Sequence, residues 1–265
     1  MRDGWKAALS LVFMTTPSDS RRVAVVTGAS AGIGEATART LAAQGFHVIC
    51  VARREGPITA LAAEIDGTAI VADVTDATAV AAMAGRLDRV DVLVNNAGGA
   101  RGLESVAEAD VEHWRWMWEA NVLGTLHVTR ALLPKLIDSG DGLIITVTSI
   151  AAVETYDNGA GYTTAKHAQG VLHRTLRSEL LGKPVRLTEV APGMVKTDFS
   201  LRRFDGDSER AEKVYQGVTP LVAEDIADVI GFVASRPSHV DLDLIVVRPR
   251  DQASGASGPR FNRTS

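Results

Sequence analysis

Tyr162 and Lys166 are two residues that can move a proton together, and they lie four positions apart in the run Tyr-Thr-Thr-Ala-Lys. On a helix this spacing places both side chains on one face. A free phenol titrates near ~10, and an ammonium group beside it favours the phenolate and lowers that pKa towards neutrality. The pair therefore predicts a proton donor and acceptor for a carbonyl and its alcohol. The same five residues also fit a half-buried tyrosine and a solvated lysine on an amphipathic helix.

A glycine-rich segment lies between an apolar run at 23–26 and a helix-forming stretch at 35–44. The apolar run is typical of a buried parallel strand, so the segment occupies the place of a phosphate-binding turn. Gly28 permits the tight turn, Gly32 allows the backbone to approach a pyrophosphate, and Gly34 allows close packing of helix and strand. The amides at the helix N-terminus would hold the anion, although a purely structural turn is the alternative. We expect the cofactor contacts in this segment to be Gly28, Ser30, Ala31, Gly32, Ile33 and Gly34.

Two arginines, Arg53 and Arg54, follow the second expected strand at 47–52. Dinucleotide folds that prefer NAD carry an Asp or Glu at this strand end, which accepts from the ribose hydroxyls. Here arginines stand in that place, and a guanidinium can pair with the 2′-phosphate of NADP. The sequence therefore predicts NADP(H) as the cofactor, although the two arginines would also suit a solvated start of the next helix.

The whole chain alternates short apolar runs with helix-forming stretches, which predicts a single Rossmann-type α/β domain at 22–250. We expect a doubly wound, mostly parallel seven-stranded sheet flanked by helices, because parallel strands are buried on both faces. The expected strands are 23–26, 47–52, 68–74, 90–94, 143–147, 185–190 and 242–247, and the expected helices are 35–44, 58–65, 77–87, 111–137, the one that carries Tyr162 and runs to 181, and 224–234. Residues 200–218 predict an irregular polar lid, and 1–21 and 251–265 predict a disordered leader and tail.

The carboxyl ends of parallel strands meet at one crevice, where ligands bind in such sheets. Asp73 would face the adenine there, or else cap the next helix together with Asp76. Two amides before glycines at 95–99 suit a turn that comes close to a ligand, and Ser149 follows the fifth strand, thirteen positions before Tyr162. The further residues that we expect to contact the cofactor are Asp73, Val74, Asn96, Ala97, Gly98, Tyr162, Lys166, Pro192, Gly193, Val195 and Thr197.

The expected helix at 111–137 contains Asn121 and three tryptophans. Asparagine has a low helix propensity, so Asn121 either bonds a backbone carbonyl or holds a water at the site. The tryptophans at 114, 116 and 118 cannot all share one helix face. We therefore expect them to serve packing or a subunit interface rather than substrate stacking.

The motifs TGASAGIG, NNAG, Asn121, Ser149, YTTAK and PGMVKT occur in this order, and with them the sequence resembles the short-chain dehydrogenase/reductase family over about residues 22–250. The resemblance implies that Ser149 holds the substrate oxygen and that Tyr162 is the acid and base. It further implies that Lys166 lowers the tyrosine pKa and binds the nicotinamide ribose, and that Asn121 anchors a proton-relay water. The implied reaction is hydride transfer between NADP(H) and a secondary alcohol or carbonyl compound. The implied assembly is a homodimer or homotetramer, built partly through the helices around Asn121 and Tyr162.

Within that family, the last third of the chain resembles the NADP-dependent 3-hydroxy acid dehydrogenases, also described as serine or allo-threonine dehydrogenases. The resemblance lies in residues 199–200, 203–207, 211–216 and 237–240. It implies a small substrate such as serine, allo-threonine or 3-hydroxyisobutyrate. A carboxylate needs a cation, for which Arg203 is the first candidate and Lys196 and Arg202 follow; solvated lid charges are the alternative.

Two segments, 192–199 and 150–161, depart from the pattern of this group and leave the substrate open. Glu154 and Asp157 would disfavour an anionic substrate if they faced inward. One alternative is an NADPH-dependent aldehyde or ketone reductase of specialised metabolism, similar to clavulanate aldehyde reductase. The other is a non-catalytic NADPH-binding sensor, which would have no need of the complete set Asn121, Ser149, Tyr162 and Lys166.

Composition and charge argue against several other classes of protein. The 265-residue chain has a formal net charge of -4 and a pI of about 5.9, with no basic block to bind nucleic acid. No run approaches the ~20 apolar residues of a membrane span. The single cysteine, Cys50, excludes an internal disulfide and fits a reducing compartment, so we expect a cytoplasmic protein. We expect a small-molecule alcohol or carbonyl substrate and no metal ion.

Overall fold

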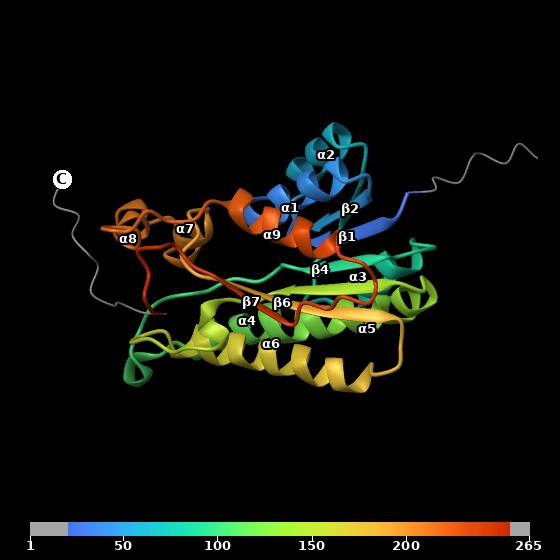
Figure 1. Cartoon of the computed structure of the whole chain (residues 1–265). Coiled ribbons are helices and arrows are strands. Elements are labelled where there is room, and N and C mark those ends of the chain that lie inside the picture. The colour runs from blue at the N-terminus through green and yellow to red at the C-terminus, as the bar shows by residue number, and fades with distance from the viewer. Residues whose placement is uncertain (1–20, 255–265) are drawn as a thin grey trace, which may run out of the picture.

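A computed structural model describes residues 21–254 of the chain. The predicted leader and tail fall mainly on 1–20 and 255–265, which lie outside the described residues. Seven strands form one parallel sheet in the order β3-β2-β1-β4-β5-β6-β7 (Figure 1). They are β1 (Val23–Thr27), β2 (His47–Ala52), β3 (Thr68–Val71), β4 (Val92–Asn95), β5 (Gly142–Val147), β6 (Val185–Pro192) and β7 (Leu244–Val247). The predicted α/β class and seven strands are confirmed, and the described sheet is parallel throughout.

Helices cover both faces of this sheet. They are α1 (Gly32–Ala43), α2 (Glu55–Glu64), α3 (Ala77–Gly85), α4 (Val111–Trp118), α5 (Gly124–Asp138), α6 (Ala160–Glu179), α7 (Phe199–Arg203), α8 (Ser208–Lys213) and α9 (Ala223–Ala234). Figure 1 shows α1, α2 and α9 above the sheet, and α4, α5 and α6 below it. Each layer buries its own hydrophobic core against the strands.

The strands form because their side chains are buried on both sides. In β1, Ala24 and Val26 pack under α1, α2 and α9, whereas Val25 packs on the opposite face with α3, α5 and α6. All three side chains are fully buried. Apolar residues are therefore needed at every position, which explains the continuous apolar runs of the sequence.

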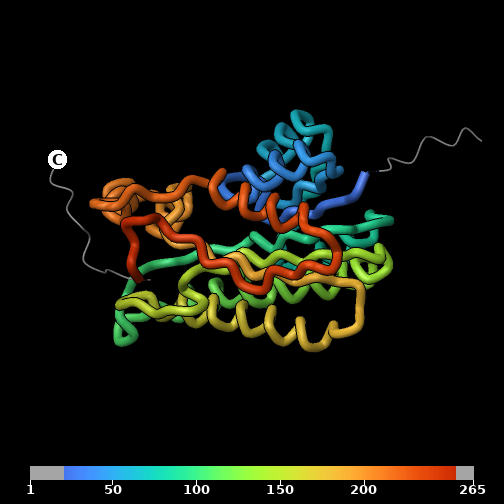
Figure 2. The backbone as a smooth tube through the Cα atoms, viewed as in Figure 1, coloured from blue at the N-terminus to red at the C-terminus, as the bar shows by residue number. Residues whose placement is uncertain are grey.

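The carboxyl ends of β1 and β4 lie at the point where the strand order reverses. The chain moves outward from β1 through β2 to β3, then crosses back to place β4 on the other side of β1. The connections on the two sides diverge there, which opens a crevice above the strand ends. Figure 2 shows the segments after β4 (green) and after β6 (orange) extending past this end of the sheet.

Two predicted elements differ from the structure. The expected continuous helix at 111–137 is divided into α4 and α5 by a π-helical turn, η2 (Glu119–Leu123), in which the amide of Gly124 bonds the carbonyl of Glu119. The expected irregular lid at 200–218 contains α7 and α8. Its polar composition concealed these short helices, although Asp207 caps α8 by accepting from the amide of Arg210 at 3.0 Å.

One strand end also differs from the sequence-based expectation. β3 ends at Val71 rather than at residue 74, because the Asp73 carboxylate accepts from the amide of Thr75 at 3.0 Å and forms a turn. Gln252 falls in the predicted tail, yet its side chain is buried and accepts from the amide of Met194 at 2.8 Å. Within residues 21–254, no helix is long and apolar enough to cross a membrane.

Candidate active site

A cavity of about 920 Å³ opens at the carboxyl ends of the strands. It brings together most of the residues that the sequence selects. Those that line it are Gly28, Ser30, Ala31, Gly32, Ile33, Arg53, Arg54, Asp73, Val74, Asn96, Ala97, Gly98, Ser149, Tyr162, Lys166, Pro192, Gly193, Val195, Thr197 and Arg203. Gly34 and Asn121 do not reach the cavity; both are buried behind its wall.

The glycine turn leads directly into α1, whose first turn faces the cavity. Ala31 occupies the N-cap position and offers no side-chain hydrogen bond, so the orphan amides of this helix end are not capped. Gly32 adopts φ +57°, and a Cβ there would lie 3.2 Å from the Thr197 side chain. The uncapped amides and the helix dipole would attract the pyrophosphate of a dinucleotide, and the lack of a side chain at Gly32 leaves room for it.

The loop after β4 is fastened to this turn through Thr27. The Thr27 hydroxyl accepts from the amides of Asn96 and Ala97, each at 3.0 Å. The Asn96 side-chain amide donates to the carbonyl of Thr27 at 2.9 Å. A Cβ on Gly34 would overlap with the carbonyl oxygen of Gly28. Gly34 therefore serves the close packing of helix and strand that the sequence predicts, without contacting the cavity itself.

The two arginines after β2 lie at the edge of the cavity. Arg53 is largely exposed and forms an ion pair with Asp73 at 3.6 Å. Arg54 donates to the carbonyl and the hydroxyl of Ser30, at 2.9 and 3.1 Å. Each arginine is thus attached to a residue that also lines the cavity. The arrangement presents two cations where a 2′-phosphate would lie, so the donor set fits NADP(H).

Tyr162 and Lys166 lie in the first half of α6 with their side chains adjacent. The Lys166 ammonium nitrogen is 5.8 Å from the centre of the Tyr162 ring. Tyr162 is 8% exposed and Lys166 is 4% exposed, so neither is the solvated surface residue that the motif alone would also allow. The spacing of the motif therefore does bring the phenol and the ammonium group together, inside the cavity wall.

Lys166 is held by two acceptors of the protein interior. Its Nζ donates to the side-chain oxygen of Gln169 at 2.8 Å and to the carbonyl of Val147 at 3.3 Å. Burial lowers the pKa of Lys166 to about 7, although the charge of Glu189 opposes that shift. Lys166 can therefore change its protonation state near neutral pH.

The phenol of Tyr162 responds to burial in the opposite direction. Burial raises the pKa of Tyr162, and Tyr156 adds to the rise, whereas the neighbouring Ser149 hydroxyl and the charge of Arg203 lower it. The sequence predicts that Lys166 lowers this pKa; in this arrangement the net shift is upward. The physical reason is that desolvation disfavours the phenolate more than the nearby positive charges favour it.

Ser149 follows β5 directly and begins a short 3-10 helix, η3 (Ile150–Ala152). Its hydroxyl oxygen accepts from the amide of Ala151 at 3.1 Å, which fixes the side chain. The hydroxyl donates to the carbonyl of Pro192 at 3.5 Å, and it lies near enough to Tyr162 to lower the pKa of the phenol. The serine and the tyrosine thus line the same cavity, where their hydroxyl groups can bind a single carbonyl or alcohol oxygen.

Asn121 is fully buried in the π-helical turn. Its side-chain nitrogen donates to the carbonyls of Met117 and Gly99, at 2.7 and 2.9 Å, and its oxygen accepts from the amide of Gly99 at 3.1 Å. These bonds to backbone carbonyls match one of the two roles that the sequence leaves open for this side chain. Asn121 thereby holds the loop after β4 against the helix.

Arg203 is the candidate cation whose guanidinium faces the Tyr162 ring. Its Nε donates to the carbonyl of Gly102 at 2.7 Å, and a terminal nitrogen donates to the Tyr156 hydroxyl at 3.1 Å. Its guanidinium is 5.8 Å from the Tyr162 ring. Lys196 instead forms an ion pair with Glu212 and does not line the cavity, and Arg202 pairs with Asp198 at its edge.

The two acidic residues that would disfavour an anionic substrate differ in placement. Glu154 forms an ion pair with Arg248 and does not line the cavity. Asp157 does line it, at an exposed position. Only one of the two carboxylates therefore reaches the site.

Among the cavity-wall residues that the sequence did not select are Trp116, Tyr156 and Gln252. Trp116 lines the cavity with the Arg101 guanidinium 4.9 Å from its ring. Tyr156 supports Arg203, and Gln252 closes the wall beside Met194. For Trp116 alone the sequence carried a signal. Because the tryptophans at 114, 116 and 118 cannot share one helix face, Trp116 points in a different direction from its two neighbours.

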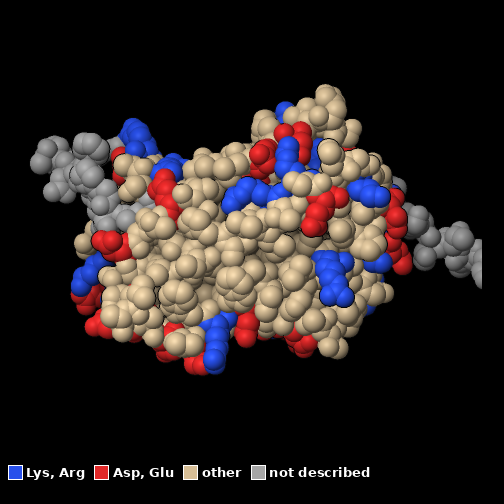
Figure 3. Space-filling model, turned by 90° about the horizontal axis from the view of Figure 1, so that it is seen from below, with Lys and Arg blue, Asp and Glu red and all other residues tan. Residues whose placement is uncertain are grey.

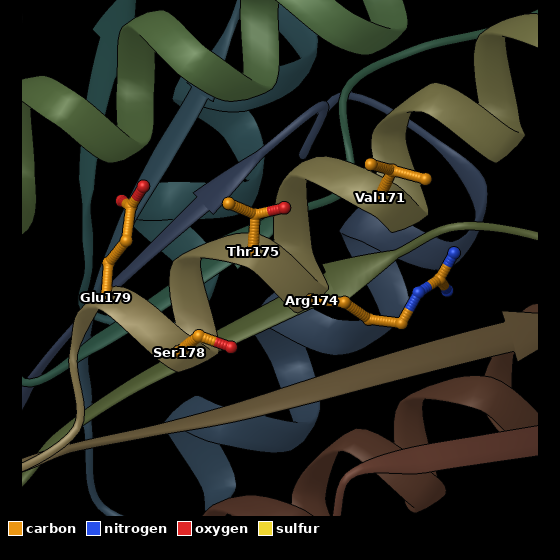
Figure 4. Close-up of a pocket in the computed structure, with 5 residues that line it drawn as sticks. All are labelled: Val171, Arg174, Thr175, Ser178 and Glu179. Atoms are coloured by element: carbon orange, nitrogen blue, oxygen red, sulfur yellow. The ribbon is translucent and has the colours of Figure 1, made fainter.

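A second, shallow hollow runs along the C-terminal half of α6. Figure 4 shows its five lining residues, Val171, Arg174, Thr175, Ser178 and Glu179. It shares no residue with the cavity that holds Tyr162. Within residues 21–254 there is also no cluster of three His, Cys, Asp or Glu side chains that could hold a metal ion.

Comparisons with known proteins point to one family. The protein-family model described as short chain dehydrogenase matches residues 22–207 of this chain. Uncharacterized oxidoreductase Rv0484c of Mycobacterium tuberculosis (strain ATCC 25618 / H37Rv) is 77% identical over 243 residues, covering 92% of this chain and 97% of that protein. NADP-dependent 3-hydroxy acid dehydrogenase YdfG of Salmonella typhi is 38% identical over 238 residues, covering 87% of this chain and 96% of that protein. The solved closed form of a serine dehydrogenase complexed with NADP+ has a TM-score of 0.85 at 34% identity, and the match covers 89% of this chain and 98% of that one.

Proposed function

This chain belongs to the short-chain dehydrogenase family, and we propose that it is an NADP(H)-dependent oxidoreductase of small 3-hydroxy acids. Serine, allo-threonine and 3-hydroxyisobutyrate are the candidate substrates. The observation that carries the substrate class is the guanidinium of Arg203 beside the Tyr162 ring, inside the cavity that also contains the glycine turn. One site then offers a proton donor for the reacting oxygen and a cation for the acid group.

The chemistry divides between the cofactor and the chain. When bound, the nicotinamide supplies or accepts the hydride at the reacting carbon. Ser149 binds the substrate oxygen, and Tyr162 gives it a proton during reduction or takes one during oxidation. Lys166 supplies the positive charge that offsets the phenolate, and Asn121 keeps the neighbouring loop in place.

NADP(H) is the cofactor that the site fits. Arg53 and Arg54 are the cations at the strand end where an NAD-specific site carries an acid. Both arginines would bind the 2′-phosphate. Arg53 would then give up part of its ion pair with Asp73. The uncapped amides of α1 would hold the pyrophosphate.

A carboxylate can reach Arg203 without breaking its present contacts. The bonds to Gly102 and Tyr156 use Nε and one terminal nitrogen of a guanidinium that has five N–H donors. The Tyr156 hydroxyl accepts from Arg203 and so keeps its own hydrogen for the same anion. The pair would therefore bind an acid group through a cation and a neutral donor.

A screen of substrates tests this proposal. NADP+ reduction is followed with serine, allo-threonine and 3-hydroxyisobutyrate, and NADPH oxidation with aldehydes and ketones that lack an acid group. We expect the hydroxy acids to be turned over with the higher kcat/KM. Activity on bulky uncharged carbonyl compounds alone would replace this proposal by the aldehyde or ketone reductase, which the Asp157 carboxylate in the wall favours. If no compound were turned over although the protein still bound NADPH, the result would support the alternative of a non-catalytic NADPH-binding sensor.

We further propose that the chain forms a homodimer or homotetramer in the cytoplasm. Seen from below in Figure 3, the face that carries α4, α5 and α6 is mostly uncharged, and its charged residues lie mainly towards the edges. These helices also have exposed apolar side chains, including Trp118, Leu126 and Val171. Light scattering after gel filtration measures the assembly, and a monomeric mass would contradict it; cell fractionation tests the location.

A further inference from the structure

Gln169 is a polar side chain at a position of α6 that is fully buried. An amide in such a place destabilises a fold unless its oxygen and nitrogen are both hydrogen-bonded. Here they are: the oxygen accepts from Lys166 at 2.8 Å, and the nitrogen donates to the hydroxyl of Thr125 at 2.8 Å. Gln169 lies three positions after Lys166, on the same helix face. Its amide is thus bonded to the ammonium group of the active site.

The chain of hydrogen bonds continues beyond Gln169. The Thr125 hydroxyl donates to the backbone carbonyl of Asn121 at 2.8 Å. From Lys166 through Gln169 and Thr125 to Asn121, every donor points in the same direction. All four residues are buried, and bonds aligned in this way polarise one another in a medium of low dielectric. The chain joins the ammonium group to the π-helical turn whose Asn121 side chain holds Gly99.

We propose that Gln169, supported by Thr125, is a positioning residue that orients the Lys166 ammonium towards Tyr162 and stabilises its charged form. Only two acceptors contact this ammonium group among the described residues, and Gln169 is the closer of the two. The inference does not depend on which alcohol or carbonyl compound is the substrate. It requires only that Lys166 acts on Tyr162.

The charged groups around Lys166 do not replace this contact. Glu189 of β6 favours the ammonium through its charge, but its oxygens are bonded to Arg174 at 3.0 Å and to the Thr148 hydroxyl at 2.8 Å. On α6 itself the neighbouring titratable group is Tyr162, and from α7 the guanidinium of Arg203 faces that tyrosine. Gln169 is therefore the side chain whose hydrogen bond favours the protonated lysine directly.

Two substitutions at this position give opposite expectations. Gln169→Met has a similar length but only a weakly accepting sulfur, so the protonated lysine loses a strong hydrogen bond and the pKa of Lys166 falls. Gln169→Glu places a negative charge against the ammonium, so the pKa rises. Thr125→Val removes the support of the glutamine amide and should lower the pKa by less than Gln169→Met does.

The test measures Lys166 first without nucleotide and then in turnover. Enzyme with 13C-labelled lysine is titrated by NMR, and the Lys166 signal is identified by its loss in Lys166→Met. We expect midpoints shifted by about one pH unit, downward in Gln169→Met and upward in Gln169→Glu, which is the size of an ordinary environmental shift. Because a lysine with a lower pKa loses its proton at lower pH, the alkaline limb of kcat for carbonyl reduction should move in the same directions.

The controls separate positioning from a purely structural role. We expect kcat of Gln169→Met to fall about tenfold while the NADPH dissociation constant changes less than about threefold. Equal midpoints in wild type and both Gln169 variants, or shifts of the same sign, would overturn the proposal. If Gln169→Met fails to fold by circular dichroism, Gln169→Glu and the near-isosteric Thr125→Val decide the question by the signs of their shifts.

Discussion

The guanidinium of Arg203 lies 5.8 Å from the centre of the Tyr162 ring, although one residue comes from α7 and the other from α6. The charge of Arg203 also lowers the pKa of the phenol and so opposes the effect of burial. An acid group bound at Arg203 and an oxygen bound at Tyr162 would be separated by only a short carbon chain. This relationship is the structural basis for expecting a small hydroxy acid.

Arg203→Met should impair the use of acidic substrates selectively. Loss of a charge-assisted hydrogen bond of roughly 1.5–3 kcal/mol corresponds to a KM raised about 10–100-fold for a hydroxy acid. An uncharged alcohol or ketone should show a change of less than about threefold. Lys196→Met is the matched control, since Lys196 pairs with Glu212 outside the cavity. Equal losses on charged and uncharged substrates would contradict a role in binding the acid group.

Tyr162→Phe should remove turnover and preserve cofactor binding. The substitution keeps the ring, which packs edge-on against Phe199 with centroids 5.6 Å apart, and deletes only the hydroxyl. General acid–base catalysis contributes about 10²–10⁴-fold, so kcat should fall by that factor. NADPH binding, followed by fluorescence, should stay within about threefold. A variant that keeps a tenth of the wild-type kcat would exclude Tyr162 as the proton donor.

The sheet and the cofactor turn could be predicted from the sequence because they depend on local patterns. Strands buried on both faces have to be apolar at every position, and Gly28 and Gly32 adopt positive φ angles of 69° and 57° that other residues rarely accept. Tyr162 and Lys166 are four positions apart, so helical geometry alone brings them together.

The remainder of the site depends on contacts between distant segments. The bond from Arg203 to Tyr156 joins the end of α7 to the loop before α6, and that from Met194 to Gln252 joins residues on either side of β7. The upward pKa shift of Tyr162 arises from burial, which a short motif does not encode. The π-helical turn at Asn121 was hidden for a similar reason, since the side chain of Asn121 bonds Gly99 across the loop after β4.

Removing the arginines after β2 should change the choice of cofactor. Arg53→Ala and Arg54→Ala should each lower kcat/KM for NADPH by about 10–100-fold, the loss expected for a charged hydrogen bond to phosphate. The kcat/KM for NADH should change less than about threefold. All measurements use one fixed salt concentration, because ionic strength screens exposed charges. Arg39→Ala is the control, since Arg39 of α1 pairs with Glu35 and Glu64. A parallel decline with both cofactors would show that the arginines do not read the 2′-phosphate.

His173 should make the fold sensitive to acid. Burial lowers its pKa to about 4, and the charges of Arg174 and Arg177 contribute in the same direction while Asp243 opposes them. An unfolded histidine titrates near ~6.5, so between pH 6.5 and 4 the unfolded chain binds more protons and the free energy of unfolding falls as pH falls.

The slope from this one group is at most roughly 1.4 kcal/mol per pH unit. Urea titrations of wild type and His173→Gln at several pH values should show that the variant lacks this part of the slope. His239→Gln, at an exposed position, controls for the loss of a histidine as such. Equal slopes in wild type and His173→Gln would mean that His173 does not cause the acid sensitivity.

Gly34→Ala should weaken cofactor binding even though Gly34 does not touch the cavity. The added methyl group would overlap with the carbonyl oxygen of Gly28 and the Asn96 side chain, so α1 would have to move away from the turn. The uncapped amides at the start of α1 would then leave the position that suits a pyrophosphate. NADPH affinity should fall by more than about tenfold, measured by fluorescence titration, and thermal stability should fall as well.

Gly85→Ala provides the contrast, because Gly85 ends α3 and nothing lies within 4 Å of a Cβ built there. Alanine has the higher helix propensity and restricts the unfolded chain, so this variant should gain about 0.5–1 kcal/mol. If Gly34→Ala bound NADPH as tightly as Gly85→Ala does, then close packing at Gly34 would not control the phosphate site. The turn would in that case owe its affinity to Gly28 and Gly32 alone.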